Sequence, residues 1–255
     1  MVDIAVVGAG TMGAGIAESA ALAGMSVTMI DVREDALERG MQTIQQDLAR
    51  RVKKGRISED ESREVVGRVQ TTISVEGCSG APLVVEAVIE DSEVKKQVFA
   101  DLEGVVGEKT VLATNTSSLS VAGIATATGS PERVVGMHFF NPVPAMRLVE
   151  VVAGPSTNPE ALIRAEEVAK SLGKTPVRVS DTPGFIVNRV ARPFYLEALR
   201  IVESGADPGK VDAQLREAGF RMGPLELAAQ RASAAARSVV LPDRGPPLCR
   251  RRRGL

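Results

Sequence analysis

The chain contains a single histidine, and its spacing from a glutamate suggests acid–base chemistry. His138 lies near the end of one apolar run, and Glu150 lies in the apolar run that follows a proline-rich turn. If the two runs form a hairpin centred on Pro144, the two side chains are opposite each other, with Cβ atoms about 5 Å apart. The carboxylate would fix the imidazole tautomer and leave the second ring nitrogen free to take a proton. The pair predicts a general base for an alcohol that loses its proton as hydride leaves its carbon. The alternative is a histidine held structurally beside two phenylalanines.

A glycine-rich loop lies near the start of the chain, between a predicted strand and a predicted helix. Residues 8–13 read GAGTMG, which fits the pattern GxGxxG. In such a loop the first glycine allows a tight turn, the second lets the backbone approach a pyrophosphate, and the third lets the helix pack close to the strand. The helix N-terminus then faces the phosphates. The residues predicted to bind a dinucleotide through this loop are Gly8, Gly10, Thr11, Met12 and Gly13.

An aspartate at the end of the next predicted strand bears on the choice of dinucleotide. Asp31 follows Gly13 by 18 residues, close to the spacing of an acid that binds the ribose 2′-hydroxyl. A carboxylate there disfavours a 2′-phosphate, so the pattern predicts NAD rather than NADP. Arg33 is close enough to leave NADP open. A structural turn with a surface aspartate is the alternative interpretation of the whole loop.

The hydrophobic pattern surrounds these residues with alternating strands and helices. Strands are predicted over 4–7, 26–30, 69–73, 83–89, 110–113, 133–139, 146–152 and 175–179. Helices are predicted over 10–23, 33–54, 93–106 and 159–172, with a short one opened by a capping box at Ser58 and Glu61, and then over 185–204 and 210–218. This alternation predicts an α/β fold: a doubly wound Rossmann-type NAD-binding domain over 1–183, followed by a smaller all-helical domain over 184–227.

Composition and charge narrow the class of protein. The 255 residues are 44% hydrophobic and 25% charged, as in a globular protein. Residues 228–255 hold seven arginines and one aspartate in an atypical Ala/Arg/Pro-rich tail, while the rest has 24 basic and 31 acidic residues, about −7. The acidic body argues against nucleic acid as a partner. Two cysteines are too few for a disulfide framework, which suggests the reducing cytoplasm. Neither a secretory signal peptide, a membrane span nor a metal site is expected.

Several stretches of the chain resemble the L-3-hydroxyacyl-CoA dehydrogenase family, which includes the 3-hydroxybutyryl-CoA dehydrogenases. The matching stretches are VVGAGTMGAGIA at 6–17, KGRIS at 54–58, VVEAVIEDSEVKKQVF at 84–99, NTSSLS at 115–120, GMHFFNPVPAMRLVEVV at 136–152, DTPGFIVNR at 181–189 and MGPLEL at 222–227. The resemblance covers about residues 2–227. It implies NAD-dependent, reversible oxidation of an (S)-3-hydroxyacyl-CoA to a 3-oxoacyl-CoA in fatty acid β-oxidation or short-chain hydroxyacyl-CoA metabolism.

The resemblance also implies roles for individual catalytic residues. His138 would be the general base, and Glu150 would orient it and stabilise the imidazolium. Ser117 and Asn188 would hydrogen-bond the reacting oxygen or the thioester region. Ser117 follows a strand at the carboxyl end of the sheet, and an amide such as that of Asn188 both donates and accepts. The alternatives are Ser117 as a helix cap and Asn188 as an interdomain hydrogen bond.

Further binding residues follow from the same resemblance. Cofactor contacts would also come from Glu90, Lys95, Ser117 and Asn141, although Glu90 and Lys95 could equally belong to a solvated charged face. Lys54 matches a region that meets the phosphates of CoA, and a lysine is a suitable point charge for phosphate. Four other basic residues are equally good candidates for binding these phosphates: Arg50, Arg51, Lys53 and Arg56.

The sequence departs from the family pattern at two places. Asp91 stands where the family commonly has asparagine, which adds a negative charge near the cofactor. Beyond Leu227 the family's remaining helices and most of its dimer interface have no counterpart, so the implied homodimer and full activity stay open. Two other functions remain: a dehydrogenase of free 3-hydroxy acids or sugar acids, and a catalytically weak or silent NAD-binding or structural relative.

Overall fold

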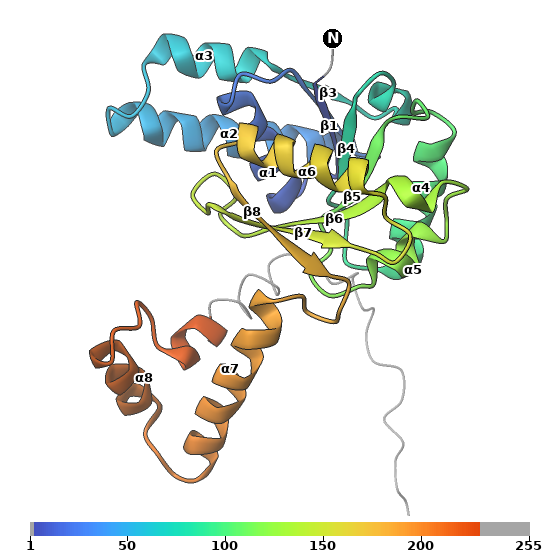
Figure 1. Cartoon of the computed structure of the whole chain (residues 1–255). Coiled ribbons are helices and arrows are strands. Elements are labelled where there is room, and N and C mark those ends of the chain that lie inside the picture. The colour runs from blue at the N-terminus through green and yellow to red at the C-terminus, as the bar shows by residue number, and fades with distance from the viewer. Residues whose placement is uncertain (1–2, 230–255) are drawn as a thin grey trace, which may run out of the picture. The chain divides into compact units, whose positions relative to one another are not determined.

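Residues 3–229, the part of the chain that the computed structural model describes, contain an eight-stranded sheet of order β3-β2-β1-β4-β5-β6-β7-β8 (Figure 1). The strands are β1 (Ile4–Val7), β2 (Val27–Ile30), β3 (Val69–Thr72), β4 (Leu83–Glu86), β5 (Val111–Thr114), β6 (Val134–Phe139), β7 (Leu148–Ala153) and β8 (Thr175–Ser180). Strands β1 to β6 are parallel, β7 is antiparallel to β6, and β8 is parallel to β7. The chain order reverses between β1 and β4. The predicted doubly wound sheet is therefore confirmed, and open sheets of this kind bind ligands where the order reverses.

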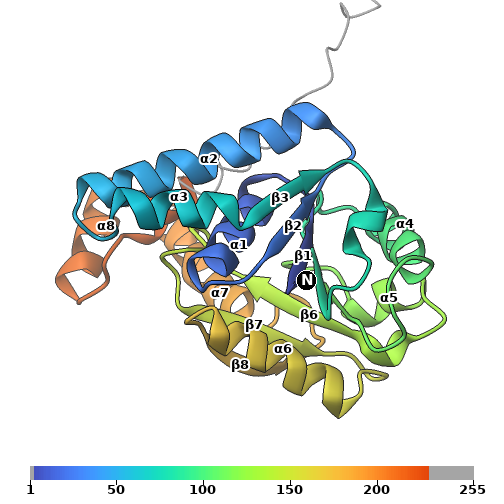
Figure 2. The ribbon, with the colours of Figure 1, turned by 90° about the horizontal axis from the view of Figure 1, so that it is seen from above.

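Helices cover both faces of the sheet (Figure 2). One face carries α1 (Thr11–Leu22), α2 (Glu34–Lys53), α3 (Glu59–Gly67) and α6 (Pro159–Ser171), and the other carries α4 (Ser92–Glu103) and α5 (Val121–Ala125). Side chains alternate between these layers along each strand. In β1, for example, Ile4 and Val6 join the core under α1 and α2, while Ala5 and Val7 join the core under α4 and α5.

The helix boundaries follow from local sequence signals. Ser58 accepts a hydrogen bond from the Glu61 amide while the Glu61 carboxylate accepts one from the Ser58 amide, which confirms the predicted capping box of α3. Asp91 caps α4 by accepting hydrogen bonds from the amides of Glu93 and Val94. The extra negative charge at Asp91 therefore faces a helix N-terminus, where it is favourable.

The structure differs from the predicted strands in a few places. β4 ends at Glu86, not at residue 89, because the Glu86 carboxylate accepts the Val88 N–H that a continuing strand would give to its neighbour. Three short helical segments were not predicted: η1 (Val75–Cys78), α5 and η2 (Pro131–Arg133). Each is too short to produce a recognisable periodicity.

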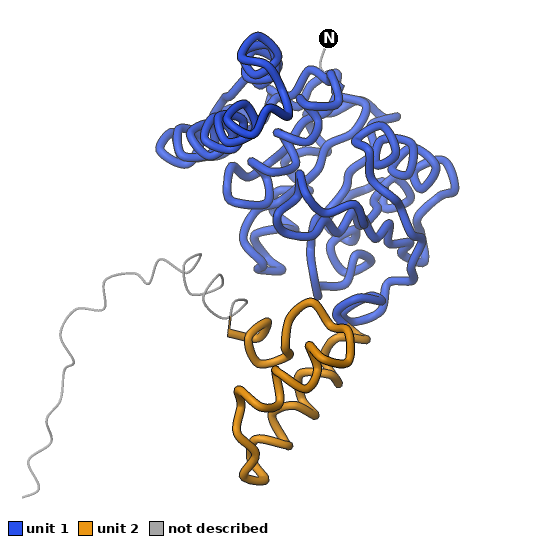
Figure 3. Tube along the Cα trace, turned by 90° about the vertical axis from the view of Figure 1, so that its left-hand side faces the viewer, with its two compact units in different colours: residues 1–188 blue, residues 189–255 orange. Residues whose placement is uncertain are grey.

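The chain divides into two compact units, residues 1–188 and 189–255, and the division falls inside α7 (Val187–Glu203) (Figure 3). In the second unit, α8 (Pro208–Glu217) carries the buried Asp212, which accepts hydrogen bonds from the amides of Leu225 and Glu226. The predicted tail lies outside the described residues from 230 onwards. Among residues 3–229, no helix has the length and apolar character needed to cross a membrane.

Candidate active site

The β6–β7 hairpin brings the predicted acid–base pair together. Its register places His138 directly opposite Glu150, which confirms the predicted pairing. His138 Nδ1 lies 2.6 Å from Glu150 Oε2, and their side chains are 7% and 1% exposed. With the carboxylate ionised, Nδ1–H donates to it and Nε2 remains the acceptor nitrogen. The pair therefore has the geometry of an oriented general base.

The other oxygen of Glu150 is held by the start of α7. Glu150 Oε1 accepts hydrogen bonds from the amides of Ile186 and Val187, both at 2.9 Å. The preceding residue, Phe185, has φ 48°, a left-handed conformation uncommon for a non-glycine residue. Its buried ring lies 5.6 Å from the imidazole of His138, centre to centre. One carboxylate thus joins the imidazole to the backbone that leads into α7.

Ser117 and Asn188 are also brought together. Ser117 lies in the loop after β5, and the Asn188 side-chain amide donates to its carbonyl oxygen at 3.2 Å. Both residues belong to the first unit. The helix-cap interpretation of Ser117 is wrong, because Ser120 caps α5 by accepting the Gly123 N–H.

A buried ion pair lies beneath this loop. Lys95 Nζ donates to Glu86 Oε1 at 2.6 Å, and the two side chains are 1% and 0% exposed. Glu86 Oε2 accepts the hydroxyl hydrogen of Thr114 at 2.7 Å. The interpretation of Lys95 as part of a solvated face is therefore wrong. Sequence reasoning missed Glu86, although an acid that ends the apolar run LVVE at the carboxyl edge of the sheet was a usable signal.

Glu90 connects the ion pair to Ser117. Its Oε2 is 3.5 Å from Lys95 Nζ, and its Oε1 accepts hydrogen bonds from the Thr116 hydroxyl and the Ser117 amide, both at 2.7 Å. Burial alone would raise the pKa of Glu90, but these hydrogen bonds and the Lys95 charge outweigh it and lower the pKa below its usual value. Glu90 is therefore a fixed anion that orients the Ser117 loop.

Replacing Lys95 by methionine is expected to destabilise the fold, because it leaves the buried Glu86 carboxylate without its counterion. We expect Lys95→Met to lower the free energy of unfolding by about 3–5 kcal/mol, measured by urea denaturation. Lys96→Met is the matched control, since the Lys96 pair with Glu93 is exposed and should contribute less than about 1 kcal/mol. Equal losses from the two variants would contradict the importance of the buried pair.

The glycine loop has the geometry that a pyrophosphate needs. A Cβ on Gly13 would lie 1.7 Å from the Gly8 carbonyl oxygen, so only glycine lets α1 pack this close to β1. A Cβ on Gly10 would meet no protein atom within 4 Å, and no side chain caps the N-terminus of α1. The first-turn amides of the helix are thus open to a phosphate ligand. Thr11 and Met12 form that first turn.

Asp31 helps to shape the loop by accepting two backbone hydrogen bonds. Its Oδ2 accepts the Ala9 N–H at 2.8 Å, and its Oδ1 accepts the Arg33 N–H at 3.1 Å. The Arg33 guanidinium pairs with Asp35, with Nε 2.9 Å from Oδ1. Arg33, the residue that could favour NADP by pairing with its 2′-phosphate, therefore already pairs with a carboxylate.

Exposed aliphatic side chains follow the carboxyl ends of the parallel strands β2, β3 and β4, and their exposure was not predicted. Val32 after β2 is 89% exposed, Ile73 after β3 is 53% exposed, and Ile89 after β4 is 68% exposed. Aliphatic side chains displayed at a ligand-binding edge suit a flat aromatic base. Ile73 and Ile89 were predicted as the last residues of their strands, so no sequence signal marked their side chains as exposed.

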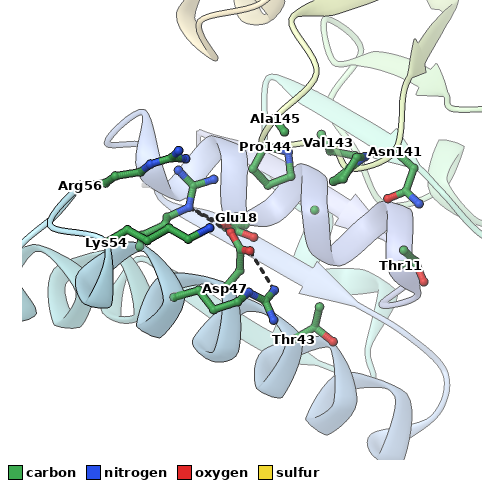
Figure 4. A pocket seen from close by; sticks show the side chains of 14 residues that line it. Thr11, Glu18, Thr43, Asp47, Lys54, Arg56, Asn141, Val143, Pro144 and Ala145 are labelled. Atoms are coloured by element: carbon green, nitrogen blue, oxygen red, sulfur yellow. Dashed lines mark hydrogen bonds and ion pairs between the residues drawn. The ribbon is translucent and has the colours of Figure 1, made fainter. Parts of the chain in front are cut away.

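A pocket lies between α1, α2 and the loop that joins β6 to β7 (Figure 4). Thr11 and Asn141 lie at one end, and Lys54 and Arg56 lie at the other. Lys174 holds the loop in place, because its Nζ donates to the carbonyl oxygens of Val143 at 2.5 Å and Met146 at 3.0 Å. The cationic side chains that line the pocket are Arg50, Arg51, Lys54 and Arg56.

Comparison with known proteins agrees with this geometry. Residues 3–182 match the family model described as 3-hydroxyacyl-CoA dehydrogenase, NAD binding domain, and residues 184–240 match that family's C-terminal domain. A 3-hydroxyadipyl-CoA dehydrogenase of Escherichia coli is 48% identical over 226 residues, 88% of this chain and 48% of that protein. A probable 3-hydroxybutyryl-CoA dehydrogenase of Bacillus subtilis is 42% identical over 229 residues, 89% of this chain and 79% of that protein.

Solved structures give the same result. An (S)-3-hydroxybutyryl-CoA dehydrogenase from Ralstonia eutropha superposes with a TM-score of 0.87 at 36% identity, covering 89% of this chain and 82% of that one. The chain spans about half the length of the E. coli relative. On the family match and these similarities, the chain belongs to the 3-hydroxyacyl-CoA dehydrogenase family.

Proposed function

We propose that the protein catalyses the NAD-dependent, reversible oxidation of an (S)-3-hydroxyacyl-CoA to the 3-oxoacyl-CoA. The observation that carries this proposal is the buried His138–Glu150 pair, which lies at the same edge of the sheet as the glycine loop. β6 is separated from β1 by β4 and β5, so the base lies three strand spacings, about 14 Å, from the loop. An extended dinucleotide bound at the loop would run along this edge toward the base.

The chemistry at the base follows from the hydrogen bonds around it. Bound NAD would accept the hydride from C3 in oxidation and return it in reduction. His138 Nε2 would take the proton of the C3 hydroxyl, and Glu150 would stabilise the imidazolium that forms. Ser117 and Asn188, joined by their own hydrogen bond, would hydrogen-bond the reacting oxygen or the thioester region.

The proposed cofactor site uses the open edge of the sheet. The α1 N-terminus would hold the pyrophosphate, and Asp31 would bind the adenosine ribose. Val32, Ile73 and Ile89 would contact the adenine. The other proposed cofactor contacts are Glu90, Lys95, Ser117 and Asn141. Because Lys95 is buried against Glu86, its contact would act through Glu90 and the Ser117 loop.

Asp31→Asn is expected to reduce the preference for NADH over NADPH about tenfold, because it removes the charge that repels a 2′-phosphate. The asparagine carbonyl can still accept the Ala9 N–H, so the loop should keep its shape. Dissociation constants of both nucleotides, measured by fluorescence, test this. Asp3→Asn is the control, because Asp3 also accepts a backbone hydrogen bond, from Ser26, but lies outside the proposed site. An unchanged preference in Asp31→Asn would remove the assignment.

The pocket beside α1 supports a CoA ester as substrate. Asn141 lies at one end of the pocket and follows the proposed base, His138, by only three residues. We therefore place the reacting end of the substrate at the Asn141 end of the pocket. Lys54, with Arg50, Arg51 and Arg56, lines the rest of the pocket, where the phosphates of CoA would be neutralised. A free hydroxy acid carries one carboxylate and no phosphates, so a CoA ester makes better use of a pocket lined by four cations.

An NADH-consumption assay tests the proposed function. We expect 3-oxoacyl-CoA esters to be reduced, with acetoacetyl-CoA and longer esters compared side by side, and free acetoacetate to be a poor substrate. Faster reduction of the free acid would favour the dehydrogenase of free hydroxy acids. NADH binding without reduction of any ester would favour the catalytically silent relative.

The assembly and location proposed for the chain rest on composition and exposure. A homodimer is proposed, because α7 exposes Leu196, Leu199 and Ile201 to 54%, 46% and 48%; sedimentation equilibrium tests it. A cytoplasmic location is proposed from the low cysteine content. Burial raises the pKa of the Cys78 thiol to about 12, so this cysteine stays a protonated thiol at neutral pH. Nucleic acid is not a proposed partner, given the acidic body.

A further inference from the structure

Two carboxyl groups lie among the cations of the pocket and have no part in the chemistry described above. Glu18 of α1 and Asp47 of α2 extend toward each other across the space between the two helices (Figure 4). The Glu18 side chain is 4% exposed and that of Asp47 is 29% exposed. Both line the pocket, so their charge acts on whatever the pocket binds.

The two acids do not share their cations equally. Asp47 Oδ1 is 2.9 Å from an Arg50 Nη, and Asp47 Oδ2 is 2.9 Å from Arg51 Nε. Glu18 Oε1 lies 3.3 Å from the same Arg51 Nε and makes no hydrogen bond within the described residues. Asp47 is therefore well compensated as an anion, whereas a charged Glu18 would be buried with only part of one arginine.

This asymmetry favours the protonated form of Glu18 over the protonated form of Asp47. Burial first, and then the neighbouring Asp47, raise the pKa of Glu18 to about 8. Burial would also raise the pKa of Asp47, but hydrogen bonds with Glu18, Arg50 and Arg51 outweigh it and lower the pKa to about 2. Near pH 7 the pair thus holds one negative charge, and above about pH 8 it holds two.

Other charged groups face the pair from the elements packed against it. Lys174, just before β8, interacts electrostatically with Glu18, and burial first and Arg51 second lower the pKa of Lys174 while Glu18 raises it. Lys54 and Arg56 line the same pocket. With four cations in the lining, ionisation of Glu18 changes the formal charge of the pocket from +3 to +2.

We propose that Glu18 and Asp47 carry a single negative charge between them at neutral pH, and that ionisation of Glu18 weakens the binding of the phosphate-bearing end of an acyl-CoA in this pocket. The inference rests on the proposed function for the identity of the ligand. Its physical basis is that an added negative charge within a partly buried pocket repels phosphate more strongly than it would in bulk water. Glu18 would then determine how affinity for the substrate depends on pH.

Calorimetric titration with acetyl-CoA, which lacks the reducible 3-oxo group, tests the proposal on the full chain. We expect the wild-type dissociation constant to rise at least about threefold between about pH 7 and about pH 9.5. In Glu18→Gln this rise should largely disappear. Glu64→Gln is the matched control, because Glu64 pairs with Arg68 outside the pocket, and it should keep the wild-type rise. Acetyl-pantetheine, which carries no phosphates, should show no rise with any of these proteins.

Asp47→Asn gives a second test, because it removes the anion that helps raise the pKa of Glu18. The midpoint of the affinity change should move to lower pH in this variant. If Glu18→Gln keeps the wild-type dependence, or if the midpoint in Asp47→Asn does not move, the inference is overturned while the proposed function stands. Acetyl-CoA that fails to bind at either pH would instead overturn the substrate class on which the inference rests.

Protein stability gives a readout of the same proton that needs no ligand. An acid whose folded pKa is raised contributes stability that is complete below its unfolded value, near 4.5, and lost as pH rises through about 8. As pH rises through this window, the Tm of Glu18→Gln should therefore increase relative to the Tm of the wild type. A difference in Tm that stays constant from about pH 4.5 to about pH 9 would contradict the shared proton.

Discussion

Glutamine in place of His138 is expected to lower kcat for acetoacetyl-CoA reduction about 100- to 10,000-fold while NADH affinity stays nearly unchanged. Glutamine can still donate a hydrogen bond to Glu150 but cannot exchange a proton with the reacting oxygen. Because His138 lies about three strand spacings from the glycine loop, its loss should not disturb the pyrophosphate site. Steady-state kinetics and NADH fluorescence titration measure the two effects separately.

Glu150→Gln is the comparison for this prediction. It keeps an oxygen for the amides of Ile186 and Val187 but loses the charge that stabilises the imidazolium. A kcat between those of the wild type and His138→Gln is expected. Near-normal turnover in His138→Gln would remove the base assignment, and a normal Glu150→Gln would limit Glu150 to a structural role.

A methyl group on Gly13 is expected to disrupt the cofactor site and the fold together. The added Cβ would lie 1.7 Å from the Gly8 carbonyl oxygen, a backbone atom that can move only if α1 shifts away from β1. We expect Gly13→Ala to lose about 3 kcal/mol or more of unfolding free energy and to bind NADH at least about 100-fold more weakly. Urea denaturation and fluorescence titration give the two values.

Gly10→Ala separates the effect on the cofactor from the effect on folding. Its Cβ meets no protein atom within 4 Å, so stability should change by about 1 kcal/mol or less. NADH affinity should still fall, about tenfold, because the methyl group would occupy the space that the pyrophosphate approaches. If Gly10→Ala and Gly13→Ala behaved alike in both measurements, the distinct roles given to the two glycines would be wrong.

The parts of the site that could be predicted from the sequence are those set by local pattern. Alternation along two strands and a turn centred on Pro144 were enough to pair His138 with Glu150, and the register bears this out. The glycine loop likewise depends on a strand, a turn and a helix that are consecutive in the chain. Such features are fixed by short-range geometry, which the spacing of residues encodes directly.

The parts that were missed depend on contacts between distant segments. Glu86 is an ordinary acid in the sequence until α4 folds back and places Lys95 against it. Glu18 lies in an alanine-rich helix, and only the packing of α2 reveals that Asp47 faces it. The left-handed Phe185 was unpredictable for another reason: the tertiary contacts of Glu150 with the following two amides override its backbone preference.

Deuterium transfer from NADH to the acyl product would show whether His138, Glu150 and the glycine loop act together in hydride transfer. NADH deuterated at the transferable position of the nicotinamide ring would be incubated with acetoacetyl-CoA and the full chain, and the product analysed by mass spectrometry and chiral chromatography. We expect (S)-3-hydroxybutyryl-CoA with one deuterium at C3, formed by the wild type and nearly absent with His138→Gln. Tight NADH binding with no deuterium in any acyl-CoA product would mean that the histidine, the glutamate and the glycine loop form a nucleotide site without dehydrogenase chemistry.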